Sequence, residues 1–178
     1  AQPPADVKAL LIYGPNAGLV RESAKAAVTF AAEDLADAFR LCELQARDIG
    51  DDPARLADEL GALSFGGGRR AVWLKDAGDP QTAIISGALE TEFGDTLLVV
   101  ESANLGRRSS LRKFFEQGDD LGAVACYEDD QNSLRDYVSE FLMAENTSIE
   151  SDALYWLLER LSNDRMQVRN ELEKLILY

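Results

Sequence analysis

The chain has 178 residues, 46% of them hydrophobic and 28% charged, and a net charge of −14 at pH 7. This length accommodates one full domain and a smaller one, and no apolar run approaches the roughly 18 residues that span a bilayer. The absence of histidine excludes Ser-His-Asp and Cys-His catalysis and most zinc sites, and the acidic charge argues against binding duplex DNA through its phosphates.

The first two-thirds of the chain alternates strand and helix patterns. Short apolar runs predict strands at 9–13, 39–46, 71–74, 97–100 and 123–127. Helical spacing of apolar residues predicts helices over 19–35, over 53–63 behind a cap at Asp52, over 83–89, and from Ser109 or Ser110 to Gly118. Because the strands are apolar on both faces, we expect an α/β fold with a parallel sheet flanked by helices.

No strand pattern follows residue 130. Amphipathic spacing predicts three helices, over 134–142, over 150–161 and over 168–176. Thr147, with Glu150 three residues later, resembles a capping box that would open the second of them. We therefore place a domain boundary near residue 131, with an α/β domain at 1–131 and a three-helix domain at 132–178. The chain stops directly after an apolar segment, so we expect more protein to follow.

A phosphate-binding loop would follow the first strand, with the pattern G-x-x-x-x-G-K-[ST]. Counting from Gly14, Leu19 stands at the second glycine, Val20 at the lysine and Arg21 at the hydroxyl, while Gly18 falls one position early. Every residue that would hold phosphate or Mg²⁺ is therefore replaced, and Arg21 is expected to be solvated. We expect no bound nucleotide, cofactor or metal. An active P-loop NTPase with a divergent loop stays open as an alternative.

Three other features are candidates for chemistry. Asp76 and Glu101 are single carboxylates at strand ends, which are more typical of structural positions. The Gly-Gly-Gly-Arg-Arg segment at 66–70 resembles an anion-binding nest, but a turn that requires positive φ is the favoured interpretation. A basic cluster indicates either a solvated helix face or a contact with an acidic partner or DNA; it consists of Arg107, Arg108, Arg112 and Lys113.

Several segments, taken in order, resemble the delta subunits of bacterial DNA polymerase III clamp loaders. They are LIYGPNAGLVRESAKAAV, ALSFGGGRRAVWLKDAGD, LLVVESANLGRRSSLRKFFEQ, ACYEDDQNSLRDYVSEFL and NDRMQVRNELEKLILY. The resemblance covers nearly the whole chain. It implies an AAA+-like first domain with a degenerate P-loop, then a helical lid domain. The resemblance also implies a third, collar domain, which we expect to lie outside this chain.

The resemblance also implies a function. Such a subunit binds and helps open the sliding clamp, the beta subunit, during DNA replication, and it works in the cytoplasm with the gamma/tau and delta prime subunits. It meets primed DNA only within that assembly and no membrane. No ATPase or other catalytic activity is expected of the chain itself, although the family belongs to a DNA polymerase (transferase) holoenzyme. The two cysteines, both in apolar stretches, are predicted to be buried thiols, as suits a reducing compartment.

The family carries an adjacent hydrophobic pair after a serine at the tip of the helix before the third strand. Aligned through Ser64, this places Phe65 at the first position and Gly66 at the second, so that one large anchor remains or Leu63 substitutes. The predicted clamp contact is therefore Leu63, Ser64 and Phe65. From the residues alone, an ordinary core position at a helix end is the favoured interpretation of Phe65, and only the resemblance favours the clamp contact. An α/β scaffolding domain unrelated to replication stays open.

Overall fold

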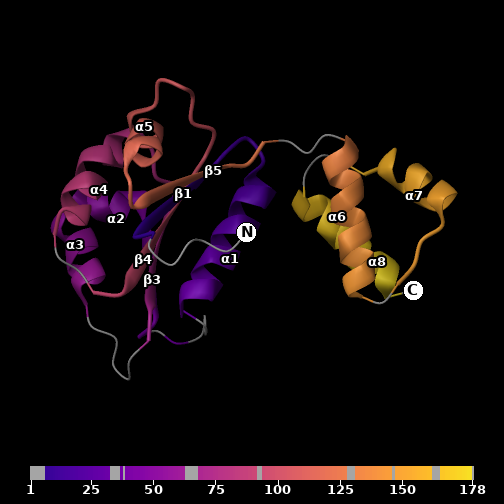
Figure 1. Cartoon of the computed structure of the whole chain (residues 1–178), viewed down its shortest axis with the longest axis horizontal. Coiled ribbons are helices and arrows are strands. Elements are labelled where there is room, and N and C mark those ends of the chain that lie inside the picture. The colour runs from indigo at the N-terminus through magenta and orange to yellow at the C-terminus, as the bar shows by residue number, and fades with distance from the viewer. Residues whose placement is uncertain are drawn as a thin grey trace. The chain divides into compact units, whose positions relative to one another are not determined.

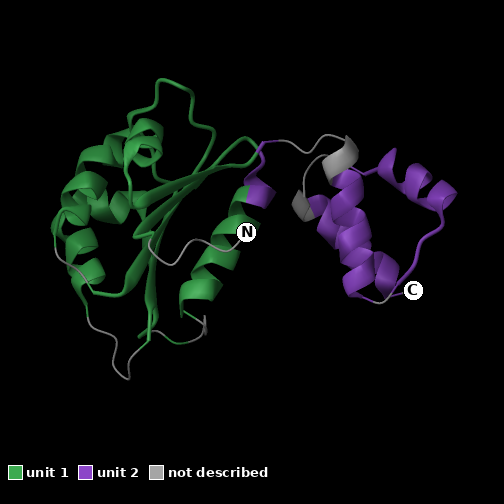
Figure 2. Cartoon of the chain, viewed as in Figure 1, with its two compact units in different colours: residues 1–15, 20–126 green, residues 16–19, 127–178 purple. Residues whose placement is uncertain are grey.

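The computed structural model describes residues 7–32, 37, 39–62, 68–91, 94–127, 131–145, 147–161 and 165–177 (Figure 1). The chain divides into two compact units (Figure 2): Ala1–Pro15 with Val20–Cys126, and Asn16–Leu19 with Tyr127–Tyr178. Among the described residues, no helix combines the length and the apolar composition that crossing a bilayer requires.

Unit 1 contains the predicted parallel sheet. Its strands are β1 (Ala9–Tyr13), β2 (Leu41–Gln45), β3 (Arg70–Lys75), β4 (Thr96–Ser102) and β5 (Leu121–Ala125). They lie in the order β2-β3-β4-β1-β5, and all four pairings are parallel. The three central strands are buried along almost their whole length, as strands covered on both faces must be. The α/β prediction is confirmed, although β2 begins two residues later than expected and β5 two residues earlier.

The helices of unit 1 cover the two faces of the sheet unequally. They are α1 (Ala17–Ala32), α2 (Ala46–Asp51), α3 (Ala54–Gly61), α4 (Thr82–Leu89) and α5 (Ser110–Gln117), with a 3-10 turn, η1, at Asp79–Gln81. Figure 1 shows α1 on one face and the group from α2 to α5 on the other. The main core lies under that group, where Leu56, Ile85 and Phe115 pack against alternate strand residues such as Leu74 and Val100.

The helix starts in unit 1 agree with the sequence-based prediction in one place and differ from it in two. Ser109 caps α5 by accepting a hydrogen bond from Arg112 N, and the helix ends at Gly118 as predicted. The short helix α2 was not predicted, because six residues carry too little periodicity to be recognised. Asp52 therefore follows α2 directly, and Pro53, not Asp52, is the N-cap of α3. The Asp52 carboxylate accepts a hydrogen bond from Ala54 N at 3.2 Å.

Unit 2 contains three described helices: α6 (Gln131–Ala144), α7 (Ser151–Leu158) and α8 (Arg165–Ile176). Their apolar faces form a separate core of Leu134, Val138, Leu142, Leu154, Val168 and Leu172. The predicted capping box is wrong: Thr147 lies four residues before α7, its hydroxyl donates to the Glu145 carbonyl, and Glu150 is the N-cap. Leu175, placed on the buried face by its spacing, is 48% exposed.

Candidate functional site

The loop between β1 and α1 has only three residues, Gly14, Pro15 and Asn16, before α1 begins at Ala17. The predicted degenerate P-loop residues from Gly18 to Arg21 therefore lie in the first turns of a helix and not in a loop. Asn16 is 5% exposed, and its side-chain oxygen accepts a hydrogen bond from Leu19 N at 3.0 Å. One of the backbone donors that could meet a phosphate is thus already used, and Val20 is buried.

Gly14 has a structural reason to be glycine. A Cβ atom built on it would lie 1.9 Å from the Cys126 carbonyl oxygen, far inside any possible contact. Cys126 N donates to Tyr13 O at 2.7 Å, so the end of β1 and the residue after β5 are held against each other. The glycine that begins the P-loop pattern therefore allows two backbone segments to pack closely against each other.

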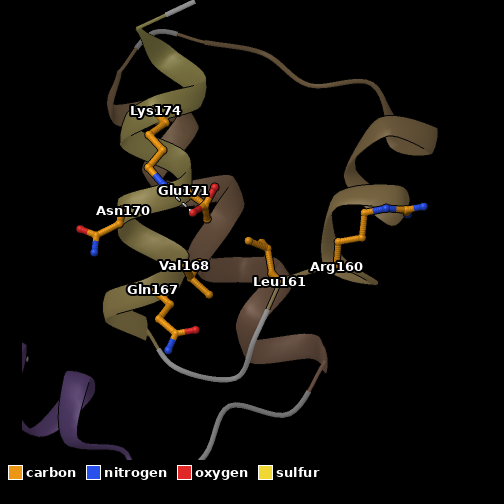
Figure 3. A pocket seen from close by; sticks show the side chains of 7 residues that line it. All are labelled: Arg160, Leu161, Gln167, Val168, Asn170, Glu171 and Lys174. Carbon is orange, nitrogen blue, oxygen red and sulfur yellow. Dashed lines mark hydrogen bonds and ion pairs between the residues drawn. The ribbon is translucent and has the colours of Figure 1, made fainter.

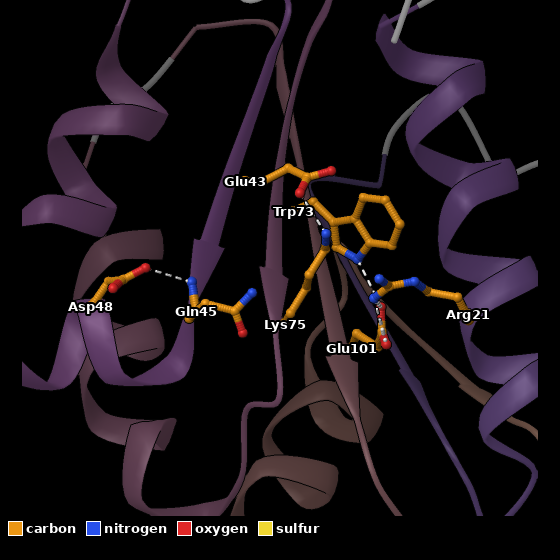
Figure 4. A network of polar contacts seen from close by, with 7 residues as sticks. All are labelled: Arg21, Glu43, Gln45, Asp48, Trp73, Lys75 and Glu101. Carbon is orange, nitrogen blue, oxygen red and sulfur yellow. Dashed lines mark hydrogen bonds and ion pairs between the residues drawn. The ribbon is translucent and has the colours of Figure 1, made fainter.

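Arg21 is not simply solvated, contrary to the sequence-based expectation. Its Nη1 atom donates to both carboxylate oxygens of Glu101, each at 3.2 Å, and its guanidinium lies 5.0 Å from the centroid of the Trp73 ring (Figure 4). The side chain is half-exposed, yet folding brings α1 across the end of β4 and supplies this partner. Glu101 is likewise no isolated carboxylate, because Trp73 Nε1 also donates to it, at 3.0 Å.

Lys75 completes this group on the other side of Trp73. Its ammonium lies 4.2 Å from the Trp73 ring centroid and forms an ion pair with Glu43 of β2, so that the indole contacts two cations (Figure 4). Two cationic and two carboxylate side chains, from α1, β2, β3 and β4, thus neutralise each other's charge on the face of the sheet that carries α1. This polar network, made of Arg21, Glu43, Trp73, Lys75 and Glu101, was not predicted, since its members are up to 80 residues apart.

Asp76 occupies the end of β3, where a metal-binding carboxylate was considered. It is exposed and has a left-handed backbone conformation, with φ of 58°. Among the described residues, no three histidine, cysteine, aspartate or glutamate side chains come together as metal ligands. Asp76 stands apart from the network, while the next residue, Ala77, donates from its backbone to the Glu101 carbonyl at 3.0 Å.

Both arginines of the Gly-Arg-Arg segment bind protein groups. Gly68 has φ of 89°, as expected for the predicted turn. Arg69 forms an ion pair with Asp95 at 3.1 Å. Arg70 is 6% exposed, and its Nη1 atom donates to the carbonyls of Glu59 and Ala62 at 2.8 and 2.9 Å. Arg70 thus caps the carboxyl end of α3, and neither arginine is available to an anion.

The predicted clamp contact, Leu63 to Phe65, lies outside the described residues, as does Gly66. The basic cluster is described and divides in two. Arg107, Arg108 and Lys113 are exposed. Arg112 instead forms an ion pair with Glu116 at 2.7 Å and lies 5.3 Å from the Tyr13 ring centroid. Three of the four predicted basic residues are therefore exposed, two of them just before α5 and one within it.

A carboxylate already occupies the amino terminus of α5. Asp79 accepts hydrogen bonds from the Ser109 hydroxyl and from Leu111 N, the latter at 3.1 Å. The Ser109 hydroxyl, and after it the Leu111 amide, hold the pKa of Asp79 below its usual value. Asp79 was not singled out from the sequence, because nothing local distinguishes it from other loop aspartates.

Two further features do not form a reactive site. Cys126 is buried and Cys42 only half-buried, and both are free thiols. Burial, and then the Glu59 carboxylate, raise the pKa of Cys42 to about 12, so its thiolate is scarce at neutral pH.

In unit 2, a pocket of about 400 Å³ is lined mainly by exposed polar side chains of α8 (Figure 3). Its Lys174 and Glu171 pair with each other at 2.7 Å.

Unit 1 has an α/β fold built on a five-stranded parallel sheet, and a helical unit follows it in the chain. Three solved structures share this fold. The DNA clamp loader delta protein of Bacillus subtilis matches with a TM-score of 0.66 and 15% identity, over 96% of this chain and 53% of that one. Domain III of the replication initiation protein DnaA of Thermotoga maritima has a TM-score of 0.58 and 12% identity, over 98% of this chain and 78% of that one, and a DNA polymerase III gamma subunit-related protein of Thermotoga maritima has a TM-score of 0.52 and 16% identity, over 76% and 46%.

In sequence, the chain is similar to a curated relative from Rickettsia prowazekii named "Probable DNA polymerase III subunit delta". The two are 23% identical over 172 residues, which cover 97% of this chain and 51% of the relative. No family model matches the chain. Sequence and fold together confirm the resemblance to delta subunits of DNA polymerase III. The chain spans about half the length of these delta relatives.

Proposed function

We propose that this chain is the first part of a delta-type subunit of a bacterial clamp loader, with residues 1–131 as its AAA+-like domain and 132–178 as its lid. It would bind the sliding clamp and help open it, together with gamma/tau and delta prime subunits in the cytoplasm. The observation that carries this proposal is the similarity to a relative named as a delta subunit over 97% of the chain, joined to the fold of a clamp loader delta protein.

The proposal includes that the chain neither binds nor hydrolyses ATP. Three observations support this: the loop before α1 has three residues, Val20 is buried where the pattern has lysine, and the Leu19 amide already donates to Asn16. Each missing charge-assisted contact is worth roughly 1.5–3 kcal/mol, which together turns a micromolar affinity into a millimolar one.

Titration calorimetry with Mg-ATP tests this directly. We expect a dissociation constant of about 1 mM or weaker. A micromolar constant, or ATP turnover that persists through repeated purification, would instead favour a divergent P-loop NTPase.

For the clamp contact, we propose the segment from Leu63 to Phe65. Support comes from the residues just before it. The apolar face of α3 is anchored through Leu56 and Leu60, and Arg70 binds the last carbonyls of the helix, so the chain leaves α3 from a fixed point. An aromatic residue that follows such a helix in the sequence suits a subunit that must favour the open clamp over the closed one.

The matched pair of variants is Phe65→Ala and Phe30→Ala, the second on α1 and 42% exposed. In a biosensor assay on the cognate clamp, Phe65→Ala should weaken binding at least about tenfold, while Phe30→Ala should change it less than about twofold. Unchanged binding by Phe65→Ala would place the grip elsewhere. If the unaltered chain bound neither the clamp nor the other loader subunits, the delta proposal itself would fail.

The exposed residues Arg107, Arg108 and Lys113 add a further proposal. Arg112 is excluded from this set by its ion pair with Glu116. On a chain of net charge −14, such basic residues can meet a DNA backbone only where other subunits supply most of the positive field. We therefore propose that they contact primed DNA within the assembled loader.

A further inference from the structure

Arg70, the first residue of β3, is a buried cation that is 6% exposed. Its Nε atom donates to the Phe39 carbonyl at 2.9 Å, and its Nη1 atom donates to the carbonyls of Glu59 and Ala62 at 2.8 and 2.9 Å. Its Nη2 atom lies 3.5 Å from the Glu59 carboxylate. These partners offset the cost of burying the guanidinium. One side chain therefore joins three segments: the residues before β2, the end of α3 and the start of β3.

At the end of α3, these bonds hold one particular peptide group. The last carbonyls of a helix have no partners within it, and Ala62, the C-cap of α3, has an extended backbone with φ of −66° and ψ of 133°. Arg70 binds the carbonyl of Ala62, which is part of the peptide bond to Leu63. The peptide group from which the proposed clamp contact continues is thus tied to β3, an interior strand of the sheet.

The other end of the connection between α3 and β3 is held as well. Gly68 has φ of 89°, a conformation that favours glycine, and a Cβ atom built on it would lie 3.1 Å from Nη1 of Arg40. The Arg40 guanidinium therefore lies directly against this glycine. Arg40 is itself fixed to the sheet, because its carbonyl accepts from Ala71 N at 2.8 Å. A segment whose two ends are held in place loses less conformational entropy when it binds a partner.

The neighbouring Arg69 has different partners. Its side chain is 18% exposed, its Nη2 atom donates to the Val7 carbonyl at 2.9 Å, and its Nε atom forms an ion pair with Asp95 at 3.1 Å. Neither partner belongs to α3. Of these two adjacent arginines, Arg70 is the one that binds the end of the helix preceding the proposed clamp contact.

We propose that Arg70 is a positioning residue for clamp binding. By holding the Ala62 carbonyl against β3, it fixes the point from which the segment from Leu63 to Phe65 continues, and it acts through that segment. The inference rests on the proposed function, because it requires the segment to bind the clamp. Lysine cannot replace Arg70 in this role, since an ammonium group lacks the planar fork that binds carbonyls of separate segments.

Arg70→Lys tests the proposal, and Arg69→Lys is the matched control. In a biosensor assay on the cognate clamp, with every variant shown to be folded by its thermal transition, Arg70→Lys should weaken binding about fivefold or more. Arg69→Lys should change binding less than about twofold. Ile85→Val, in the core under α3, controls for a general loss of stability and should also stay within about twofold. Equal effects of Arg70→Lys and either control would overturn the proposal.

Should Arg70→Lys fail to fold, Arg70→Gln takes its place, because it removes the buried charge and retains a hydrogen-bond donor. The same loss of about fivefold or more is expected of it. A folded Arg70→Gln that binds the clamp as the unaltered chain does would refute the role of Arg70.

Combination with Phe65→Ala separates positioning from a general structural effect. If Arg70 acts through the segment, Arg70→Lys should weaken clamp binding less than about twofold once residue 65 is alanine. The same loss in both backgrounds would mean that Arg70 acts by another route and would refute the proposal. Binding by Phe65→Ala at the strength of the unaltered chain would overturn the proposed clamp contact together with this inference. Weakened binding by Phe65→Ala, joined to unchanged binding by Arg70→Lys, would overturn the role of Arg70 alone.

Discussion

Replacing Arg21 and Glu101, singly and together, measures how firmly α1 is tied to the sheet. The pair joins residues 80 apart in sequence through two contacts of 3.2 Å, and the Glu101 side chain is 14% exposed while that of Arg21 is 47% exposed. Glu101 has a second role, since Trp73 Nε1 donates to it and Trp73 is only 5% exposed. The two single substitutions should therefore differ in cost.

Two unit charges about 4 Å apart attract by about 4 kcal/mol at an effective dielectric constant near 20, before desolvation and side-chain entropy are subtracted. Exposed pairs retain about 0.2–1 kcal/mol, and the low exposure of Glu101 puts this pair at the upper end, near 1 kcal/mol of coupling. Glu101→Ala should cost about 2 kcal/mol, because it also leaves the Trp73 N–H without its acceptor. Glu101→Gln retains an acceptor and should cost less.

The assay is urea unfolding followed by Trp73 fluorescence in a Trp156→Phe background, which removes the only other tryptophan. The coupling energy should shrink in about 1 M salt, where the Debye length is near 3 Å. The exposed pair Arg169 and Glu173 of α8 provides the comparison, with about 0.3–0.5 kcal/mol expected. The reasoning is refuted if Arg21 and Glu101 show no coupling, or if Glu101→Ala costs no more than Arg21→Ala.

Two further predictions concern stability. Gly14→Ala should destabilise the fold by about 3 kcal/mol or more, since its Cβ would meet the Cys126 carbonyl at 1.9 Å, whereas Gly50→Ala, with nothing within 4 Å, should be neutral or stabilising. Thermal unfolding compares the two, and equal midpoints would contradict this account. Because the pKa of Asp79 is lowered in the folded state, its contribution is complete above pH of about 4 and is lost as pH falls through the lower folded value. Asp79→Asn should therefore flatten the acid side of the stability profile, and an unchanged profile would exclude Asp79 as a cause.

Much of the fold could be predicted because its signals are local. The buried run from Leu97 to Val100 indicates a strand covered on both faces, and Ser109 followed by an amphipathic segment indicates the start of a helix; both are confirmed. The predicted capping box at Thr147 is wrong because its sequence pattern is not specific to helix starts. A serine or threonine three residues before a glutamate recurs in loops, and only the actual start of α7 decides between them.

For the candidate site, the sequence by itself determined that the phosphate-binding residues are replaced: Val20 stands at the lysine position of the pattern and Arg21 at the hydroxyl position. The tertiary structure alone decided what these positions do instead. Gly14 contacts the backbone after β5, and Arg21 binds Glu101, because long-range chain packing brings together residues that carry no shared local pattern. Likewise the apolar run from Ala123 to Tyr127 predicts a strand, but strand order depends on how the crossover helices pack. Only the folded sheet therefore shows that this strand is an edge.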